Sequence, residues 1–237
     1  MASIHDGHRE RMRNKYFKYG LEQFETHEML EMLLFFTRQQ GNTNPIAHKL
    51  LDRFGSLSAV LSAPVDELMK VDGVGEHSAM LISMILPLYR QCLLEKHPLP
   101  KKFTSNESIH KFLRAYYINK TEEEVIMILL DNSMRVLKMM KISEGIVNRS
   151  AIDFAIISRE IVKNNAATVI LSHNHPKGFS TPSKQDIMVT VAIRDNLYAL
   201  GCVFHDHIIV GEKDIFSFSA SNEYKGFIDK SKEKPQK

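Results

Sequence analysis

Apolar residues recur at the spacing of an α-helix throughout the first hundred positions, and turn-forming glycines separate the segments that carry them. Such spacing is typical of helices that bury one apolar stripe. The pattern therefore predicts an all-helical N-terminal domain. Its helical segments are 27–39, 45–54, 64–71 and 77–94.

Beyond residue 105, stretches of helical periodicity alternate with short apolar runs that are typical of strands. Strands alternating with helices favour a mixed sheet covered by helices, so we expect an α+β (α/β-like) C-terminal domain. Ser150 and Asp153 are spaced like a capping box at the start of one helix. The expected helices are 106–118, 150–165 and 187–201, and the expected strands are 124–131, 135–143, 167–174, 202–211 and 215–220.

The best domain boundary lies within residues 95–108, where two prolines, a lysine pair and a polar cluster interrupt the periodic sequence. We expect a helical domain over 1–98, a linker over 99–106 and the sheet domain over 107–222. The remaining residues, 223–237, are charged and aperiodic. They predict a disordered tail.

The composition is that of a globular protein, because 43% of the 237 residues are hydrophobic and can form a sizeable core. No apolar run is long enough to cross a bilayer, and the first residues are charged where a signal peptide needs an apolar segment. We therefore expect a cytoplasmic protein with no membrane partner. Cys92 and Cys202 lie far apart without a CxxC partner, which fits reduced thiols. Any metal would then be held by histidine and carboxylate.

The net charge of +3 is too small to indicate a strongly basic nucleic-acid binder. Basic residues do gather near the N-terminus. A basic arm of this kind could touch phosphates, although a solvated helix face is the commoner explanation. The residues are Arg9, Arg11, Arg13, Lys15 and Lys18.

His173 and His175 stand two residues apart at the end of an apolar strand, so both imidazoles point to one face and can converge on one ion. An isolated H-x-H pair is more often two unrelated histidines. What favours a metal site is the following run, in which Thr181 and Pro182 fit an N-cap and a first helical residue. Asp186 then lies early in the next helix. Two imidazoles and one carboxylate predict a three-ligand metal site.

Three protein ligands leave a tetrahedral zinc ion one open position for water, as in catalytic rather than structural zinc sites. Zinc makes hydroxide available near neutral pH, so the predicted chemistry is hydrolysis. Ser183 lies at the same helix start as Asp186, and its hydroxyl could donate to a developing oxyanion. The spacing fits a purely capping role for Ser183 equally well.

The run HNHPKGFSTPSKQD, residues 173–186, resembles the signature of the JAMM (MPN+/JAB) zinc metalloprotease fold, and more closely its RadC family version. The resemblance covers nearly the whole chain except the tail. It implies one zinc ion on His173, His175 and Asp186, in a hydrolase of metallopeptidase or isopeptidase type with a peptide or protein substrate. Further segments that read like RadC, in the family's order, are 7–20, 71–75, 123–137, 144–171 and 206–211.

The family pattern also implies a glutamate, at the start of the first strand of the domain, that moves a proton from water to the leaving amine. Glu122, Glu123 and Glu124 all stand there. The RadC spacing, counted back from Asp131, selects Glu123. Alternation along a strand also places Glu123 on the face that the other two avoid. The alternative is that all three are solvated charges at a strand edge.

Asp206 and His207 match a further RadC pattern, and they could orient a metal ligand from behind. His205 and His207 form a second H-x-H pair, but no suitably spaced carboxylate motif follows it. A strand histidine with a satisfied hydrogen bond is the default interpretation there.

The turn Gly73-Val74-Gly75 precedes a predicted helix and resembles a helix-hairpin-helix element, whose backbone N–H groups can hold a DNA phosphate. The neighbouring Asp72 and Glu76 are acidic, which disfavours DNA. We therefore expect a packing module that makes at most weak, sequence-independent contact with DNA.

Three functions follow from these patterns. The first is the zinc-dependent hydrolase, with Glu123 as base and Ser183 on the oxyanion. The second is a DNA repair or recombination protein whose helical domain contacts DNA while the metal domain acts on bound protein. Direct nuclease action is disfavoured, because a two-metal nuclease needs clustered carboxylates. The third is a metal-binding interaction module without turnover.

Overall fold

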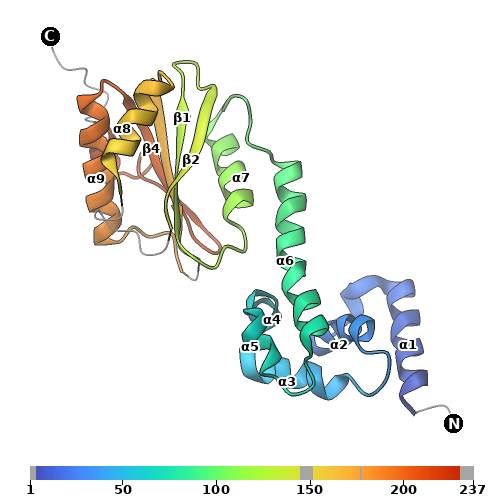
Figure 1. Cartoon of the computed structure of the whole chain (residues 1–237). Coiled ribbons are helices and arrows are strands. Elements are labelled where there is room, and N and C mark those ends of the chain that lie inside the picture. Colours follow the sequence, from blue (N-terminus) through green and yellow to red (C-terminus); the bar gives the residue numbers. More distant parts are fainter. Residues whose placement is uncertain (1–3, 145–151, 177, 230–237) are drawn as a thin grey trace. The chain divides into compact units, whose positions relative to one another are not determined.

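The computed structural model of the chain describes residues 4–144, 152–176 and 178–229 (Figure 1). In these ranges, helices build the N-terminal part, and a five-stranded mixed sheet with flanking helices builds the C-terminal part. The predicted α+β class is confirmed. The helices are α1 (Ile4–Tyr19), the 3-10 helix η1 (Gly20–Gln23), α2 (Thr26–Thr37), α3 (Asn44–Phe54), α4 (Leu57–Ser62), α5 (Val65–Met69), α6 (Glu76–Lys96), α7 (Asn106–Tyr117), α8 (Phe154–Lys163), α9 (Lys184–Ala199) and α10 (Lys225–Asp229). The strands are β1 (Glu124–Leu130), β2 (Val136–Glu144), β3 (Thr168–Asn174), β4 (Val203–Val210) and β5 (Ile215–Ser217). None of the helices in the described ranges is long and apolar enough to span a bilayer.

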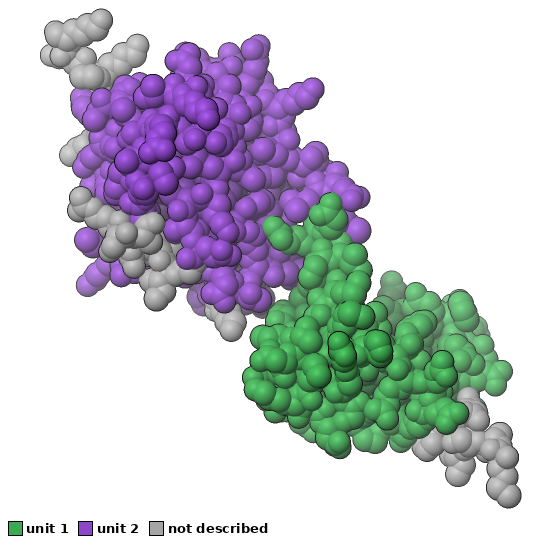
Figure 2. All heavy atoms as spheres, in the orientation of Figure 1, with its two compact units in different colours: residues 1–91 green, residues 92–237 purple. Residues whose placement is uncertain are grey.

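The chain divides into two compact units, and the boundary between them lies between residues 91 and 92, inside α6 (Figure 2). The segment predicted as a linker contributes to the second unit. The N–H of Val136 donates to the carbonyl of Lys101 over 2.9 Å, and the side chain of Phe103 is buried in the core beneath α7. The domain limits drawn from the sequence stay predictions.

The helices α2, α3, α4, α5 and α6 of the first unit enclose one apolar core, and each contributes buried side chains to it. The turn before α6 packs tightly against α3. Gly73 has a φ of +93°, and a Cβ at this position would lie 2.8 Å from the Cδ1 of Ile46. Only glycine therefore fits there without strain. The fully buried core residues include Leu30, Ala47, Leu50, Val60, Leu68 and Ala79.

The second unit is built on a sheet with the strand order β2-β1-β3-β4-β5, in which only β3 and β4 pair in parallel. Figure 1 shows α7 on one face of this sheet and α8 and α9 on the other. Val125 packs into the core on the α8–α9 side, whereas Ile126 packs on the α7 side. The alternation continues along β1, so the strand is buried on both faces, as its continuous apolar run predicts.

The register of β3 determines what faces α9. In the antiparallel pairing with β1, Val125 lies opposite His173, and opposed residues share a face of the sheet. His173 therefore faces the α8–α9 side. After Asn174 the chain turns and enters α9, which connects β3 to its parallel neighbour β4. This connection brings the start of α9 to the histidine-bearing end of β3.

The predicted disordered tail is wrong for its first part. Residues 225–229 form α10, and Ile228 is fully buried in the core on the α8–α9 side. Ile228 and the partly buried Tyr224 therefore order a segment that composition alone assigns to solvent. Residues 230–237 lie outside the described residues.

Two predicted elements are shorter in the structure. The strand expected over 215–220 ends at Ser217, because the chain turns where Ser219 and Ala220 bond back to Asp206 and Ser217. The helix expected from Ser150 begins at Phe154. Asp153 is its N-cap and accepts the N–H groups of Ala155 and Ile156, while Ser150 lies outside the described residues.

Replacing Gly73 by alanine should destabilise the first unit by roughly 1–3 kcal/mol, because the residue has a positive φ and its added Cβ meets Ile46. Gly75→Ala is the matched control, since a Cβ at that position meets nothing within 4 Å. Urea unfolding followed by circular dichroism measures both variants. Equal losses of stability in the two would contradict this account of the turn.

Candidate metal centre

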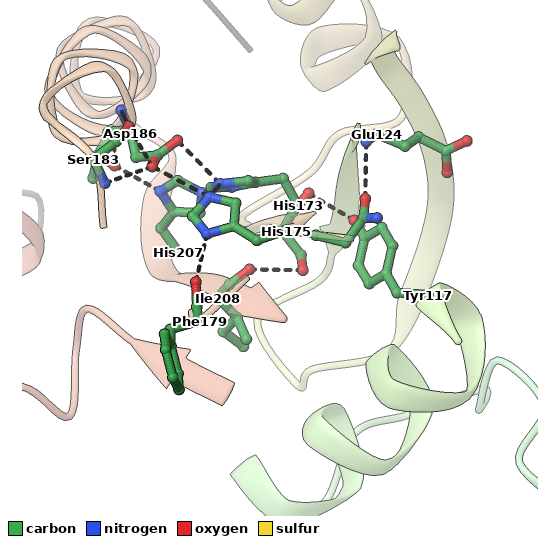
Figure 3. Close-up of polar contacts among 12 residues, drawn as sticks. Tyr117, Glu124, His173, His175, Phe179, Ser183, Asp186, His207 and Ile208 are labelled. Carbon is green, nitrogen blue, oxygen red and sulfur yellow. Dashed lines mark hydrogen bonds and ion pairs between the residues drawn. The ribbon is translucent and has the colours of Figure 1, made fainter. Parts of the chain in front are cut away.

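Three side chains from β3 and the start of α9 converge on the α8–α9 face of the sheet (Figure 3). The Nε2 atom of His173 lies 3.1 Å from the Nε2 of His175 and 3.0 Å from the Oδ1 of Asp186. The Nε2 of His175 lies 3.5 Å from the Oδ2 of Asp186. Among the described residues, this is the one group of three His, Cys, Asp or Glu side chains close enough to hold a metal ion. His173 and Asp186 are buried, and His175 is partly open to solvent.

The ring of His175 is oriented by the loop that follows it. Its Nδ1 donates to the carbonyl of Phe179 over 2.8 Å, so the other nitrogen, Nε2, faces the cluster. The loop is itself bonded to the β4–β5 turn, where the N–H of Ser180 donates to Asp214 and the N–H of Glu212 donates to Gly178. The protein therefore fixes His175 from both its backbone and its outer nitrogen.

The ring of His173 is held by a chain of three buried hydrogen bonds. Its Nδ1 lies 2.9 Å from the Nε2 of His207, whose Nδ1 lies 2.6 Å from the Oγ1 of Thr190. The hydroxyl of Thr190 donates to the backbone carbonyl of Asp186 over 2.6 Å. Because this hydroxyl has one proton, it accepts from His207, and His207 in turn accepts from His173. The chain thus leaves the Nε2 of His173 as the nitrogen that faces the other two ligands.

The charge state of His207 agrees with these directions. Burial lowers the pKa of His207 well below the usual value, and the neighbouring His173 adds to the effect. A neutral imidazole has one donor and one acceptor nitrogen, which is what the chain requires.

Asp186 is oriented by the N-terminus of α9. Its Oδ2 accepts the N–H and the hydroxyl of Ser183, over 2.7 and 2.6 Å, and its own N–H donates back to the Ser183 oxygen. Burial alone would raise the pKa of Asp186, but hydrogen bonds from His173 and His175 hold it far below its usual value. The carboxylate is therefore charged and available as a ligand.

The predicted start of this helix is wrong by two residues. The sequence indicated Thr181 as N-cap and Pro182 as first helical residue, whereas Ser183 is the N-cap and α9 begins at Lys184. The reciprocal capping box of Ser183 and Asp186 explains the difference, since it satisfies two backbone N–H groups at once. The capping role of Ser183 is thus present in the structure.

The three adjacent glutamates before β1 lie in different surroundings. Glu124 points to the α7 side, where Tyr116 and Lys120 bind its carboxylate, and Lys120 holds its pKa below the usual value although burial opposes this. Glu122 is exposed. Glu123 is partly buried and, together with Asp186, raises the pKa of His175. Of the three, Glu123 is the one that acts on the cluster.

Comparison with known proteins fits this arrangement. The family described as RadC-like JAB domain matches residues 103–224, and the family described as UPF0758 N-terminal matches residues 6–80. This chain belongs to the RadC family. The UPF0758 protein of Fusobacterium nucleatum is 35% identical over 90% of this RadC chain and 94% of its own length. That of Ruegeria pomeroyi is 30% identical over 93% of this chain and 98% of its own. The resemblance carried by the HNHP run is confirmed, and with it a JAB/MPN-type fold.

Asp206 and His207, the two residues expected to lie behind the metal ligands of this RadC protein, point to opposite faces of the sheet. His207 faces the cluster, whereas Asp206 faces the α7 side and accepts from the hydroxyl of Ser217 and the N–H of Ser219. Burial raises the pKa of Asp206 above its usual value. Asp206 thus holds the end of β5, and it does not join His207 behind the ligands.

A bulge in β4 decides which of the pair faces the metal centre. Val169 lies opposite Phe204, but the next residue, Ile170, lies opposite Asp206, so His205 is the extra residue. A bulge shifts the alternation of all residues that follow it. If β4 ran without a bulge, His205 would pair with Ile170, so Asp206 would face the cluster and His207 would face α7.

The Gly73-Val74-Gly75 turn lies in the first unit, immediately before α6. Val74 is buried, and the carbonyl of Gly75 accepts a hydrogen bond from Ala79 in the first turn of the helix. Two cations lie beside the turn. Arg38 donates to the carbonyl of Gly73 over 2.6 Å, and Lys49 pairs with Asp72 over 2.6 Å.

Two residues at the centre were not predicted from the sequence. Thr190 carries the hydrogen-bond chain, and its signal was the spacing of four residues from Asp186, which places both on one face of α9. Asn174 lies between the two histidines and bonds to the backbone before β1. Its signal was weaker, because the residue between two ligands on a strand points to the other face.

His207→Ala should weaken the binding of a divalent metal probe, Co²⁺ or Zn²⁺, by about 10- to 100-fold, because it leaves His173 without its outer partner. His205→Ala is the matched control from the same strand, since His205 lies in the bulge. Competition with a chromophoric chelator measures both affinities. Equal affinities in the two variants would exclude the proposed support of His173.

Proposed function

We propose that this RadC protein is a zinc-dependent hydrolase of the metallopeptidase or isopeptidase type, with one zinc ion on His173, His175 and Asp186. The observation that carries the proposal is that two imidazole Nε2 atoms and one carboxylate converge. The other polar atoms of these three side chains already make hydrogen bonds. Tetrahedral zinc with bonds of about 2.0–2.2 Å requires its ligand atoms to lie about 3.4 Å apart. The two Nε2 atoms lie 3.1 Å apart, the Nε2 of His173 lies 3.0 Å from the Oδ1 of Asp186, and one ligand atom from each residue lies within 4.8 Å of the others, which is close to this requirement.

When bound, zinc would supply a Lewis acid that makes water nucleophilic near neutral pH and polarises the substrate carbonyl. Three protein ligands leave one coordination position for such chemistry, and the partial exposure of His175 marks the side from which substrate reaches it.

In this proposal Glu123 is the general base and then the general acid. Its carboxylate accepts a proton from the attacking water and delivers it to the leaving amine when the carbon–nitrogen bond breaks. Its electrostatic effect on His175 supports this placement, and the pairing of Glu124 with Lys120 argues against the neighbouring glutamate.

Two roles proposed for Ser183 both need its single hydroxyl proton. In the free protein the hydroxyl donates to Asp186 over 2.6 Å. Donation to a developing oxyanion would require this bond to break, so the oxyanion role belongs to the substrate-bound state. Loss of Ser183 would affect both the orientation of a ligand and the transition state.

Glu123→Gln should lower hydrolysis by about 10²- to 10⁴-fold while the protein still takes up one zinc ion at saturating zinc, because the variant keeps all three ligands and loses the proton-accepting group. The assay is cleavage of a panel of peptide and isopeptide-linked substrates, analysed by mass spectrometry, with and without a chelator. Glu122→Gln is the matched control and should keep full activity, since Glu122 is exposed.

Full activity of Glu123→Gln would show that another group is the base. Zinc uptake by the wild type without turnover on any of the substrates would favour a metal-binding interaction module instead.

We also propose that the first unit contacts the DNA backbone through the Gly73-Val74-Gly75 turn. Lys49 and Arg38 support this second function, because both cations lie at the turn and Lys49 offsets the acidic Asp72. Backbone N–H groups at the start of a helix, together with cations, favour phosphate without reading sequence. DNA would then bring the hydrolase to its protein substrate.

Lys49→Ala should lower the salt dependence of DNA binding by about one phosphate contact, on double-stranded DNA of any sequence. Lys111→Ala is the control, since Lys111 pairs with Glu107 on α7 in the second unit. Fluorescence anisotropy at several salt concentrations measures the slope. Wild-type protein without salt-sensitive binding would refute the DNA contact.

A further inference from the structure

Strand β3 leaves its partner β1 at the position where the metal ligands begin. The two strands pair regularly up to Val125 and His173. Two residues later, the N–H of His175 donates to the carbonyl of Val210 on β4, on the other side of β3. The backbone ladder between β1 and β3 therefore stops beside Glu123, the residue that must face the cluster.

The side chain of Asn174 bonds to β1 at this point. Its Oδ1 accepts the N–H of Glu124 over 2.9 Å, and its Nδ2 donates to the carbonyl of Glu122 over 3.1 Å. These are the backbone groups immediately after and immediately before Glu123. The side chain is almost completely buried, with 2% exposed. One amide thus holds the peptide planes on both sides of Glu123.

This arrangement explains why the residue is asparagine. A primary amide offers an acceptor and a donor at the end of one short side chain. Serine is too short to span both groups, and aspartate has no donor for the Glu122 carbonyl and would add a buried charge.

The direction of the Glu123 side chain follows from those two peptide planes. Successive residues of an extended chain point to opposite faces. Glu124 is fixed toward α7 by Tyr116 and Lys120, as Figure 3 shows for its direction away from the histidines. With the backbone on both sides held by Asn174, Glu123 faces the side on which His173 and His175 lie.

We propose that Asn174 is a positioning residue that holds Glu123 against the metal ligands by binding the two backbone groups that flank it. The inference rests on the proposed role of Glu123. It assigns to the central residue of the HNH run a task distinct from ligation, and it connects the ligand strand to the strand that carries the base.

The first experiment tests the hydrogen bonds themselves, in metal-free protein, by amide hydrogen exchange resolved by NMR. In Asn174→Ala the N–H of Glu124 should exchange at least about tenfold faster, while the N–H groups within residues 126–130 keep their protection. Asn164→Ala is the matched control, because its amide bonds only to Glu160 at the end of α8. An unchanged rate at Glu124 would overturn the proposal.

The second experiment tests the consequence by a double-mutant cycle in zinc affinity, measured against a chromophoric chelator. Glu123→Gln should weaken zinc binding by about tenfold, because it removes a negative charge near the ion. Asn174→Ala should weaken it by nearly as much. In the Glu123→Gln background the same substitution should change the affinity by less than about twofold, because there is no carboxylate left to position.

Equal effects of Asn174→Ala in both backgrounds would mean that Asn174 acts on the histidines directly, and they would overturn the proposal. An unchanged zinc affinity in Glu123→Gln would overturn it as well, since that carboxylate would then lie out of reach of the ligands. If Asn174→Ala does not fold, Asn174→Ser takes its place in both experiments. Failure of the proposed function appears differently, as wild-type protein that binds no zinc or cleaves no substrate.

Discussion

The pairing of Val125 with His173 is the constraint on which the metal centre depends. Because side chains alternate along a strand, this one register decides that His173 and His175 face α9. The same register places Glu123 on that face and sends Glu124 to the α7 side. A slip of β3 by one residue would turn His173 toward the core beneath α7, away from the face on which Glu123 lies. The apolar residues of β1, which are buried on both faces, make such a slip costly.

Burial then demands that each polar atom behind the ligands has a partner. His173 and His207 are both fully buried, as is Thr190, and an unpaired polar group at that depth costs about 1–3 kcal/mol. The structure meets the demand with a single directional chain that ends on the carbonyl of Asp186. The chain connects β3, β4 and α9, so the interactions that satisfy the core also fix the relative placement of two ligands. The same hydrogen bonds therefore stabilise the fold and hold the site in place.

Sequence reasoning found what depends on local periodicity and missed what depends on pairing between distant strands. The spacing of two residues between His173 and His175 already predicts that both side chains lie on the same face of the sheet. Which of Asp206 and His207 faces the cluster could not be predicted, because it depends on a bulge at His205 that only the pairing with β3 reveals. The start of α9 was misplaced because Thr181-Pro182 is a sound local signal that the reciprocal bonds of Ser183 and Asp186 outweigh. The start of the tail was misjudged because Tyr224 and Ile228 pack against the core on the α8–α9 side.

A proton on His175 stabilises the cluster of His173, His175 and Asp186. Asp186 raises the pKa of His175 above its ordinary value of 6.5, so the imidazolium form pairs with the carboxylate. Because the folded pKa of His175 is raised, this contribution to stability is fully present below the ordinary value and is lost as the pH rises through the raised value. A metal ion bound at this cluster would require the neutral imidazole, so it would replace the proton as the partner of Asp186 over the same pH range. Above this range a bound ion would take over the role of the proton, while His173, His175 and Asp186 keep the hydrogen bonds of their outer atoms.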